Sequence, residues 1–271
     1  MMKLGLLGPE GTFSEIAARK WNDKAELVFL DDNELVARAV DDGVCDEAIV
    51  PIENSVEGPV GVVHDQLLKN KSPIVGEVIV PIRQCLLSRG QPSEIKVILS
   101  HPQALGQCRK YLREHYPKAE LRPTGSTTHA AKLAQEFNEM AAVGSVAAAE
   151  RYGLNIIARG IQDTEANYTR FIVIGKKVPA PTGNDKTSMA VYLDRDRPGA
   201  LYEFLGEFAR RQINMTRIES RPSRLTLGDY WFFIDVEGHL EDGPVKEAIV
   251  SLEKMVPELK VLGSYPRAKL T

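Results

Sequence analysis

The sequence predicts an α/β protein with a two-lobed N-terminal domain and a smaller C-terminal domain. Strand-like and helix-like segments alternate through the first 178 of its 271 residues. An extended stretch at 74–87, broken by Pro73 and Pro81, divides this alternation into two lobes. A second division is segment 179–186, which has the Pro- and Gly-rich composition of a linker. The 43% of hydrophobic residues is ample for buried cores.

Lobe one comprises about residues 1–80 together with 163–178. Its apolar runs predict strands, and a helix is expected after each strand: strands at 3–7, 26–30 and 47–50, helices at about 13–21, 33–41 and 59–68. Thr12 and Glu15 have the spacing of a capping box at the start of the first helix. The free amide groups of that helix should lie at the carboxyl edge of the sheet, where anions are favoured.

Lobe two repeats the alternation over about residues 81–162. Strands are expected at 96–99, 119–122, 140–143 and 155–158, with helices between them. Such alternation predicts sheets rich in parallel strands and covered by helices on both faces. Two lobes of this kind, joined by extended crossings, resemble the two-lobed solute-binding proteins of the periplasm. We therefore expect a ligand cleft between them.

Composition excludes several classes of function. The net charge of −3 and the lack of a basic stripe argue against nucleic acid as a partner. No apolar run approaches 18 residues, so no membrane association is expected. The first residues lead directly into a strand, and we expect a cytoplasmic protein. Three widely spaced cysteines are expected to be buried thiols, and the five histidines show no ligand spacing, so no metal site is predicted.

Polar side chains follow several of the predicted strands. Each of them taken alone is explained by helix capping, because Ser and Thr satisfy the free amide groups at a helix start. Together they suit a compact anionic ligand with hydroxyl and carboxylate groups. Hydrolysis is not expected, because neither a Ser-His-Asp order nor a Gly-x-Ser-x-Gly motif is present. The side chains are Thr12, Asn54, Ser55, Ser100, Gln103 and Ser126.

Segment 163–171 returns the chain to lobe one and leads into a buried strand that ends at Gly175. Side chains alternate along a strand, so Thr169 and Phe171 should share one face while Arg170 points to the other. A hydroxyl beside an aromatic ring would suit a small ring-bearing substrate. The alternative is an ordinary strand entry, in which Asn167 caps a turn.

The C-terminal part, 187–271, shows the order βαββαβ in about 80 residues, which is that of a ferredoxin-like fold. Its first helix begins at about Gly199, where small residues allow close approach to the backbone. Glu219 and Arg221 should lie on one face of its second strand, where a surface ion pair would contribute little.

Several of these motifs occur together, in the same order, in prephenate dehydratases. The resemblance covers residues 3 to about 265 and rests on segments 8–14, 51–55, 100–105, 125–127 and 169–171, which read GPEGTFS, PIENS, SHPQAL, GST and TRF. Segments 199–201 and 219–222, GAL and ESRP, resemble the ACT regulatory domain fused to that enzyme. One departure is that Thr128 and His129 interrupt the small-residue run expected after Thr127.

The resemblance implies conversion of prephenate to phenylpyruvate with loss of carbon dioxide and water, without a metal or organic cofactor. Thr169 would be the catalytic residue and would assist departure of the ring hydroxyl. Glu53 is expected to orient neighbouring groups rather than to act as the acid. Substrate binding is assigned to Asn54, Ser55, Ser100, Gln103, Ser126, Thr127, Arg170 and Phe171.

The resemblance also implies feedback inhibition by L-phenylalanine bound to the ACT domain. Residues expected at this regulatory site are Gly199, Ala200, Leu201, Asn214, Met215, Glu219, Ser220, Arg221 and Pro222. Because such domains pair side by side, a homodimer or a dimer of dimers is expected.

The sequence is also compatible with two alternative functions. Arogenate dehydratase would use the same cleft on an amino-acid analogue of prephenate. A two-lobed small-molecule sensor without catalysis would share the architecture, although the motif at Thr169 and the lack of a secretion signal favour the enzyme.

Overall fold

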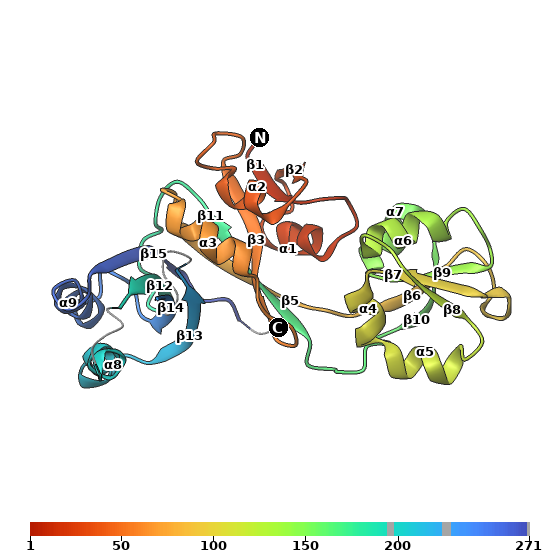
Figure 1. Cartoon of the computed structure of the whole chain (residues 1–271). Coiled ribbons are helices and arrows are strands. Elements are labelled where there is room, and N and C mark those ends of the chain that lie inside the picture. Colours follow the sequence, from red (N-terminus) through yellow and green to blue (C-terminus); the bar gives the residue numbers. More distant parts are fainter. Residues whose placement is uncertain (194–197, 224–228, 270–271) are drawn as a thin grey trace.

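The computed structural model describes residues 1–193, 198–223 and 229–269. Lobe one lies in the middle of the molecule, with lobe two on one side and the C-terminal domain on the other (Figure 1). The chain crosses between the lobes twice, before β6 (Cys85–Ser88) and after β10 (Asn155–Arg159). This arrangement confirms the predicted class, a two-lobed α/β domain followed by a βαββαβ domain.

Lobe one is built on a mixed sheet. In this sheet β1 pairs in parallel with β2 and β3, and β11 lies antiparallel between β3 and β5. The strands that carry the chain to and from lobe two are therefore neighbours. The elements of lobe one are β1 (Lys3–Leu7), α1 (Phe13–Trp21), β2 (Glu26–Leu30), α2 (Asn33–Arg38), β3 (Glu47–Asn54), β4 (Gly58–Pro59), α3 (Gly61–Lys69), β5 (Ile74–Pro81) and β11 (Tyr168–Ile174).

Thr12 caps α1 as predicted, since its hydroxyl accepts a hydrogen bond from the Glu15 amide at 3.4 Å. The Glu15 carboxylate, however, accepts from the amide of Gly11 at 2.7 Å rather than from that of Thr12. The cap is therefore one residue wider than the predicted capping box.

Lobe two contains a five-stranded sheet in the order β10-β6-β9-β7-β8. In this sheet β7 pairs in parallel with β8 and β9, whereas β6 pairs antiparallel with both β9 and β10. Besides β6 and β10, its elements are the 3-10 turn Pro92–Glu94, β7 (Val97–Ser100), α4 (Pro102–Gln107), α5 (Arg109–His115), β8 (Glu120–Pro123), α6 (Thr127–Ala134), β9 (Met140–Gly144) and α7 (Val146–Tyr152).

The single helix expected between residues 100 and 115 is two helices, α4 and α5, that meet at Cys108. The Cys108 thiol is fully buried, and this burial raises its pKa to about 12. The carboxylate of Asp163 accepts the Lys110 amide at the start of α5, with oxygens at 3.1 and 3.2 Å. A free amide group at the start of α5 is thus bonded to a carboxylate 53 residues away in sequence. The local sequence pattern gave no sign of this second helix start.

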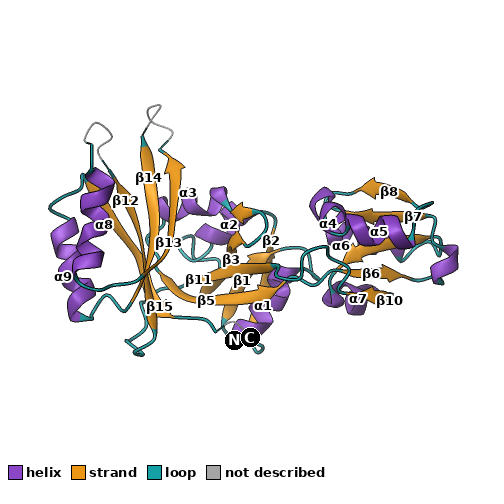
Figure 2. Cartoon of the chain, turned by 90° about the horizontal axis from the view of Figure 1, so that it is seen from below, coloured by secondary structure: helices purple, strands orange, loops and turns teal. Residues whose placement is uncertain are grey.

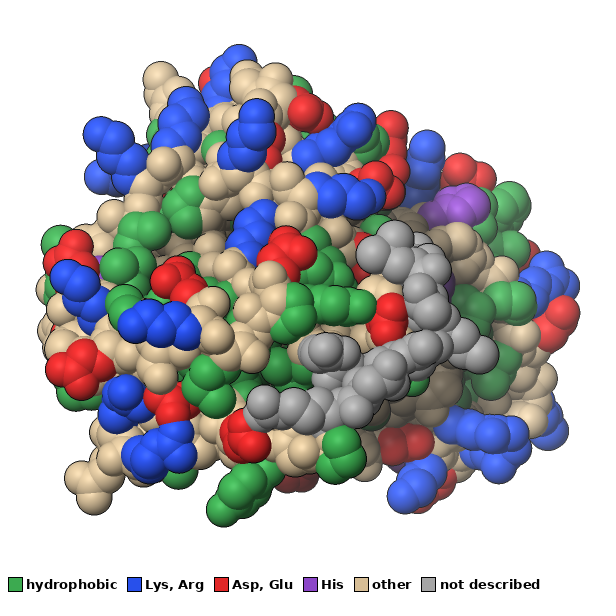
Figure 3. Space-filling view, turned by 60° about the vertical axis from the view of Figure 1, so that its left-hand side comes forward, with side chains coloured by type: hydrophobic (Ala, Val, Ile, Leu, Met, Phe, Trp, Pro, Cys, Tyr) green, Lys and Arg blue, Asp and Glu red, His purple; other side chains and the backbone are tan. Residues whose placement is uncertain are grey.

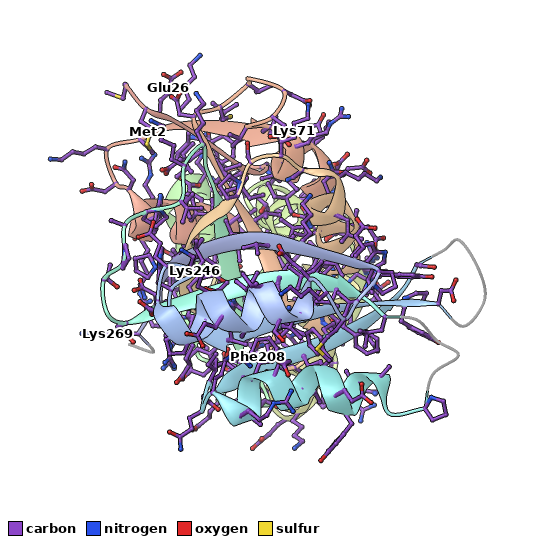
Figure 4. All side chains as sticks on the ribbon, turned by 90° about the vertical axis from the view of Figure 1, so that its left-hand side faces the viewer. Met2, Glu26, Lys71, Phe208, Lys246 and Lys269 are labelled. Carbon is purple, nitrogen blue, oxygen red and sulfur yellow. The ribbon has the colours of Figure 1, made fainter. Side chains whose placement is uncertain are left out.

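The C-terminal domain is an antiparallel sheet in the order β13-β14-β12-β15. Its helices α8 and α9 lie side by side against one face of the sheet (Figures 2 and 4). Phe204 and Phe208 of α8 are buried in the core that they form with the strands. The elements are β12 (Asp185–Tyr192), α8 (Ala200–Arg210), β13 (Met215–Pro222), β14 (Tyr230–Glu237), α9 (Gly243–Leu252) and β15 (Glu258–Pro266).

This domain is not the self-contained unit that the sequence suggested. The face of its sheet opposite α8 and α9 carries Ala190, Phe233 and Leu262, which share one core with Val63 and Leu67 of α3. An apolar sheet face must be covered, and here lobe one covers it. The two parts of the chain therefore bury a common core.

The sheet of the C-terminal domain also continues into that of lobe one. β15 pairs in parallel with β5 at Gly263 and Ile74, which gives a ten-stranded sheet. A Cβ at Gly263 would overlap the backbone of Ile74, so the approach requires glycine at this position.

The surface is mixed in charge. On the face shown in Figure 3, basic and acidic side chains are interspersed between small apolar patches, in keeping with the net charge of −3. Within the described residues, no helix is both long enough and apolar enough to cross a membrane.

Candidate active site

A cleft of about 310 Å³ lies between the two lobes. This volume is within the range of pockets that bind small molecules, roughly 300–1,000 Å³. Lobe one contributes Leu7, Gly8, Thr12, Phe13, Asn54, Ile82 and Thr169, and lobe two contributes Gln84, His101, Gln103, Ala104, Gln107, Gly125, Ser126 and Thr127.

Thr169 and Asn54 are opposite each other on β11 and β3, where the two strands enter the cleft. The Nδ2 atom of Asn54 donates a hydrogen bond to the Thr169 hydroxyl at 2.9 Å. The Oδ1 atom of the same side chain accepts the amides of Val56 and Glu57 at 2.9 and 3.0 Å. Two backbone donors on one side of the amide decide its orientation, so the nitrogen faces Thr169.

This geometry controls the direction of the Thr169 hydroxyl. A hydroxyl has one proton to donate, and here its oxygen already accepts the Asn54 amide. Its proton stays available, and because Thr169 lines the cleft it can donate to a ligand there. The Thr169–Asn54 pair is thus a hydrogen-bond donor held by a rigid sheet.

Gln107 connects lobe two to the same pair. Its Oε1 atom accepts from Asn167 at 3.2 Å, and Asn167 in turn accepts from Asn54 at 2.8 Å. Its Nε2 atom donates to the Glu57 carboxylate at 3.0 Å. A chain of amide groups therefore runs from lobe two to Thr169.

Two helices begin at the cleft, and their first turns present backbone amide groups. Thr12 precedes α1, while Ser126 caps α6 by accepting the His129 amide at 2.9 Å. Helix N-termini favour anions. The described residues that line the cleft include neither Lys nor Arg. An anionic ligand would therefore be held by dipoles and hydroxyl groups rather than by cationic side chains.

Comparison with known proteins agrees with this geometry. A family model described as prephenate dehydratase matches residues 4–179, and an ACT domain model matches residues 191–254. The prephenate dehydratase of Lactococcus lactis subsp. lactis (strain IL1403) is 40% identical over 97% of this chain and 97% of its own length.

This chain belongs to the prephenate dehydratase family. A solved structure of prephenate dehydratase in complex with L-Phe, from Arthrobacter aurescens, is 38% identical and has a TM-score of 0.90, covering 98% of this chain and 90% of that one. A structure described as a novel type of quorum quenching acylase is 30% identical, with a TM-score of 0.89 and 98% coverage of both chains.

Five of the residues that the family resemblance assigned to catalysis and substrate binding meet in the cleft: Asn54, Gln103, Ser126, Thr127 and Thr169. His129, whose position in the small-residue run departs from the family pattern, is exposed and does not line this cleft.

Two of the residues predicted to bind substrate, Ser100 and Ser55, do not line the cleft. Ser100 is fully buried, and its hydroxyl donates to the carbonyl of Val143 at 2.7 Å, bracing β7 against β9. Ser55 donates to the carbonyl of Ala166 at 3.0 Å and accepts the Tyr168 amide at 2.9 Å. Both hydroxyls bind backbone atoms of neighbouring segments, and neither residue lines the cleft. Their assignment to substrate binding stays a prediction.

Phe171 and Arg170 do not line the cleft either. Phe171 is 2% exposed and packs in the core of lobe one with Leu6 and Ile49, so it does not share the exposed position of Thr169. A register shift in the β11–β3 pairing separates Arg170 from Phe171, which simple alternation did not anticipate. Arg170 points away from the cleft, as predicted for its face, and is buried among charged groups.

Among the cleft residues to which sequence reasoning gave no role are Phe13, Gln84, His101 and Gln107. Phe13 and His101 lie within the quoted motifs 8–14 and 100–105, so their position was available although no role was assigned to them. Gln107 is one helical turn from Gln103, which places both on one face of α4. Gln84 lies in a chain crossing and had no signal in the local pattern.

The predicted regulatory residues lie at two places in the C-terminal domain. Gly199 adopts a left-handed conformation (φ +85°) at the start of α8, followed by Ala200 and Leu201. Ala200 borders an open pocket of about 230 Å³ beneath that helix start. The others lie next to or within β13, namely Asn214, Met215, Glu219, Ser220, Arg221 and Pro222.

Arg221 has a partner outside its own domain. Its guanidinium lies against Gly61 and donates to the Asp65 carboxylate of α3 at 3.1 and 3.3 Å. The surface pair with Glu219 that the strand pattern suggested is therefore replaced by a contact with lobe one.

Proposed function

We propose that this chain removes carbon dioxide and water from prephenate in the interlobe cleft, yielding phenylpyruvate. The observation that carries the proposal is the Asn54–Thr169 pair, in which Asn54 donates to the Thr169 hydroxyl at 2.9 Å and leaves its proton available in a cleft of suitable size. Family membership supports the same reaction. The enzyme is a decarboxylating lyase, and we place it in the cytoplasm.

Thr169 is the proposed catalytic residue. Prephenate is a cyclohexadienol, and loss of both groups creates an aromatic ring, so much of the driving force lies in the substrate. A threonine hydroxyl is a weak acid, so we assign it a hydrogen bond to the departing hydroxyl rather than full proton transfer. The proton that completes the water molecule then comes from solvent. Assistance of this kind is worth about 10²- to 10⁴-fold in rate.

The two carboxylates of the substrate are assigned to the helix starts. Ser126, Thr127 and the first turn of α6 offer hydroxyl and amide donors for one of them, and Gln103 of the same lobe also lines the cleft. Leu7, Phe13, Ile82 and other apolar side chains form the remaining wall. A carboxylate without a cationic partner beside an apolar wall is poorly solvated, which favours its loss as carbon dioxide.

Glu53 serves this site as an orienting group. Its carboxylate pairs with Arg217 at 2.8 Å and with Arg170 at 3.1 Å, on the side of β3 away from the cleft. It is therefore not positioned to protonate the substrate.

L-Phenylalanine is the proposed feedback inhibitor, bound at the C-terminal domain. The ACT match and the Arthrobacter structure with L-Phe support this assignment. The left-handed Gly199 and the pocket beside Ala200 offer backbone and space for an amino acid. β13 forms one end of the described sheet, and an edge strand is a natural surface for pairing two copies. We accordingly propose a homodimer or a dimer of dimers.

Incubation of the purified protein with prephenate, with and without L-phenylalanine, tests the proposal. Phenylpyruvate should form and its rate should fall when L-phenylalanine is added. Arogenate in place of prephenate should turn over more slowly; preferential conversion of arogenate to phenylalanine would instead assign the alternative dehydratase activity.

An acylase assay belongs in the same experiment, because the acylase structure is 30% identical to this chain. Hydrolysis requires an activated nucleophile. The cleft hydroxyls of Thr12, Ser126 and Thr169 are engaged with backbone or amide groups instead. We expect no acyl cleavage; acyl cleavage without phenylpyruvate formation would reject the dehydratase proposal.

A further inference from the structure

Arg170 is held by four groups on the face of β11 opposite the cleft. Its Nε atom donates to Glu77 at 2.6 Å, and its Nη1 atom donates to Glu53 at 3.1 Å and to Asp235 at 2.6 Å. Its Nη2 atom donates to the hydroxyl of Tyr265 at 2.9 Å. A planar guanidinium bonded in this way has little freedom to move.

Two of these four partners belong to the C-terminal domain. Asp235 lies on β14 and Tyr265 on β15, and the Ser188 hydroxyl bonds to both, at 2.5 and 2.6 Å. Glu77, on β5 of lobe one, also binds the ammonium group of Lys186 at 2.8 Å. The charged side chains of the two domains are thus interleaved around Arg170.

The charges around Arg170 are balanced and shielded from water. The side chains of Glu77, Asp235 and Arg170 are 1%, 4% and 9% exposed. Removing one partner from a buried set leaves a charge uncompensated in a region of low dielectric. These buried charged side chains therefore favour a single position of the C-terminal domain against lobe one. The set holds three positive and three negative side chains, namely Arg170, Lys186, Arg217, Glu53, Glu77 and Asp235.

Neighbouring positions on β11 and β3 link these charged side chains to the cleft. In the β11–β3 pairing, Thr169 is opposite Asn54 and Arg170 is opposite Glu53. One pair faces the cleft and the next pair faces the C-terminal domain. Because neighbouring Cα atoms are about 3.8 Å apart across a rigid peptide, a displacement of Arg170 must shift Thr169.

We propose that Arg170 is a positioning residue through which the C-terminal domain holds Thr169 and Asn54 in their reactive geometry. The proposal rests on the proposed role of Thr169. It assigns to Asp235 and Tyr265, which do not line the cleft, an effect on the chemical step.

Asp235→Asn and Tyr265→Phe test this assignment in the full-length protein. Each keeps the shape of the side chain while removing one charge or one hydroxyl. For Asp235→Asn we expect kcat to fall about 10-fold or more while KM for prephenate stays within about 3-fold, because misplacement of a reacting group lowers turnover more than binding. Tyr265→Phe should show a smaller fall in kcat.

Lys260→Met is the matched control. Lys260 also joins the C-terminal domain to lobe one, donating to the carbonyls of Leu67, Leu68 and Asn70 at 3.0, 2.7 and 2.6 Å. These acceptors lie at the end of α3 and not on β11. We expect Lys260→Met to lower the melting temperature with kcat unchanged within about 2-fold.

Hydrogen exchange at residues 167–171 supplies a readout that does not depend on activity. Amide protection there should fall in Asp235→Asn and stay at the wild-type level in Lys260→Met. The inference is overturned if folded Asp235→Asn keeps wild-type exchange in this segment, or if Lys260→Met reduces kcat equally. A wild-type protein that forms no phenylpyruvate would refute the proposed function, while the exchange comparison still decides whether the C-terminal domain holds β11.

Discussion

The two sides of lobe one make contacts of very different kinds. Toward the C-terminal domain, lobe one shares a sheet through Gly263, a common apolar core and a buried charge set around Arg170. Toward lobe two, the described residues share neither a sheet nor an apolar core; one buried hydrogen bond, from the Ser145 hydroxyl to the carbonyl of Gly11 at 2.7 Å, joins the lobes. Glu10 and Arg151 pair across the gap with side chains 45% and 58% exposed.

This difference indicates which parts of the molecule move together. Local opening is cheapest where few apolar contacts are lost. Lobe one and the C-terminal domain should therefore behave as one body, and lobe two should move against it. The cleft lies at the weaker interface, where a ligand can enter, and the Thr169 side chain belongs to the more rigid body.

Thr169→Ala should have the largest effect and should act on activity alone. The hydroxyl faces the cleft, so its loss is expected to reduce kcat by about 10²- to 10⁴-fold. The melting temperature should change little, because the side chain is only half-buried. Thr169→Ser, which retains the hydroxyl, should keep most of the turnover; if alanine did so as well, the assignment of Thr169 would be wrong.

Gly263→Ala tests the continuous sheet. A Cβ here would overlap the backbone of Ile74, so the β15–β5 pairing must yield. We expect the free energy of unfolding to drop by about 3 kcal/mol in denaturant titration. Gly243→Ala, at the open start of α9 where a Cβ meets no atom within 4 Å, is the control and should leave stability nearly unchanged.

His64 makes the stability of the rigid side dependent on pH. Burial, together with nearby Arg217, lowers its pKa from 6.5 to about 4. Since Arg217 donates to its Nε2 atom at 2.6 Å, the neutral ring donates from Nδ1 to the carbonyl of Val60. The unfolded chain takes up a proton below pH 6.5 and the folded one does not, so stability is complete above that value and declines as pH falls toward 4.

The expected loss between pH 7 and pH 5 is about 2 kcal/mol for this one group. Denaturant titrations of the wild type and of His64→Gln at both pH values measure it. The variant should be less stable at pH 7 but should show a flatter dependence on pH. An identical slope in both proteins would show that His64 is not buried in its neutral form.

Arg151→Ala should have the smallest effect. Its ion pair with Glu10 crosses the weaker interface and is well exposed to solvent. Such pairs contribute about 1 kcal/mol or less. We expect a shift in melting temperature close to the error of the measurement. A loss as large as that of Gly263→Ala would contradict the comparison between the two sides.

Much of the site was predictable because its residues come in short motifs beside strand ends. Asn54, Gln103 and Ser126 lie at or just after strand ends, and parallel strands bring such ends to one edge. Thr169 begins the antiparallel strand β11, whose start lies beside the end of β3. These residues could be predicted to meet although they are far apart in the sequence. Ser100 shows the limit, since its place after a strand is correct but its hydroxyl turns inward to Val143.

The amino-acid sequence alone predicted the alternation of strands and helices and several of the polar residues that meet in the cleft, because apolar periodicity and helix capping act over a few residues. Tertiary structure decided how the domains join. Arg170 meets Glu77 and Asp235, which are 93 and 65 residues away, and neither contact leaves a local pattern. A buried charge must find partners wherever the folded chain brings them, and only the packed sheet shows which these are.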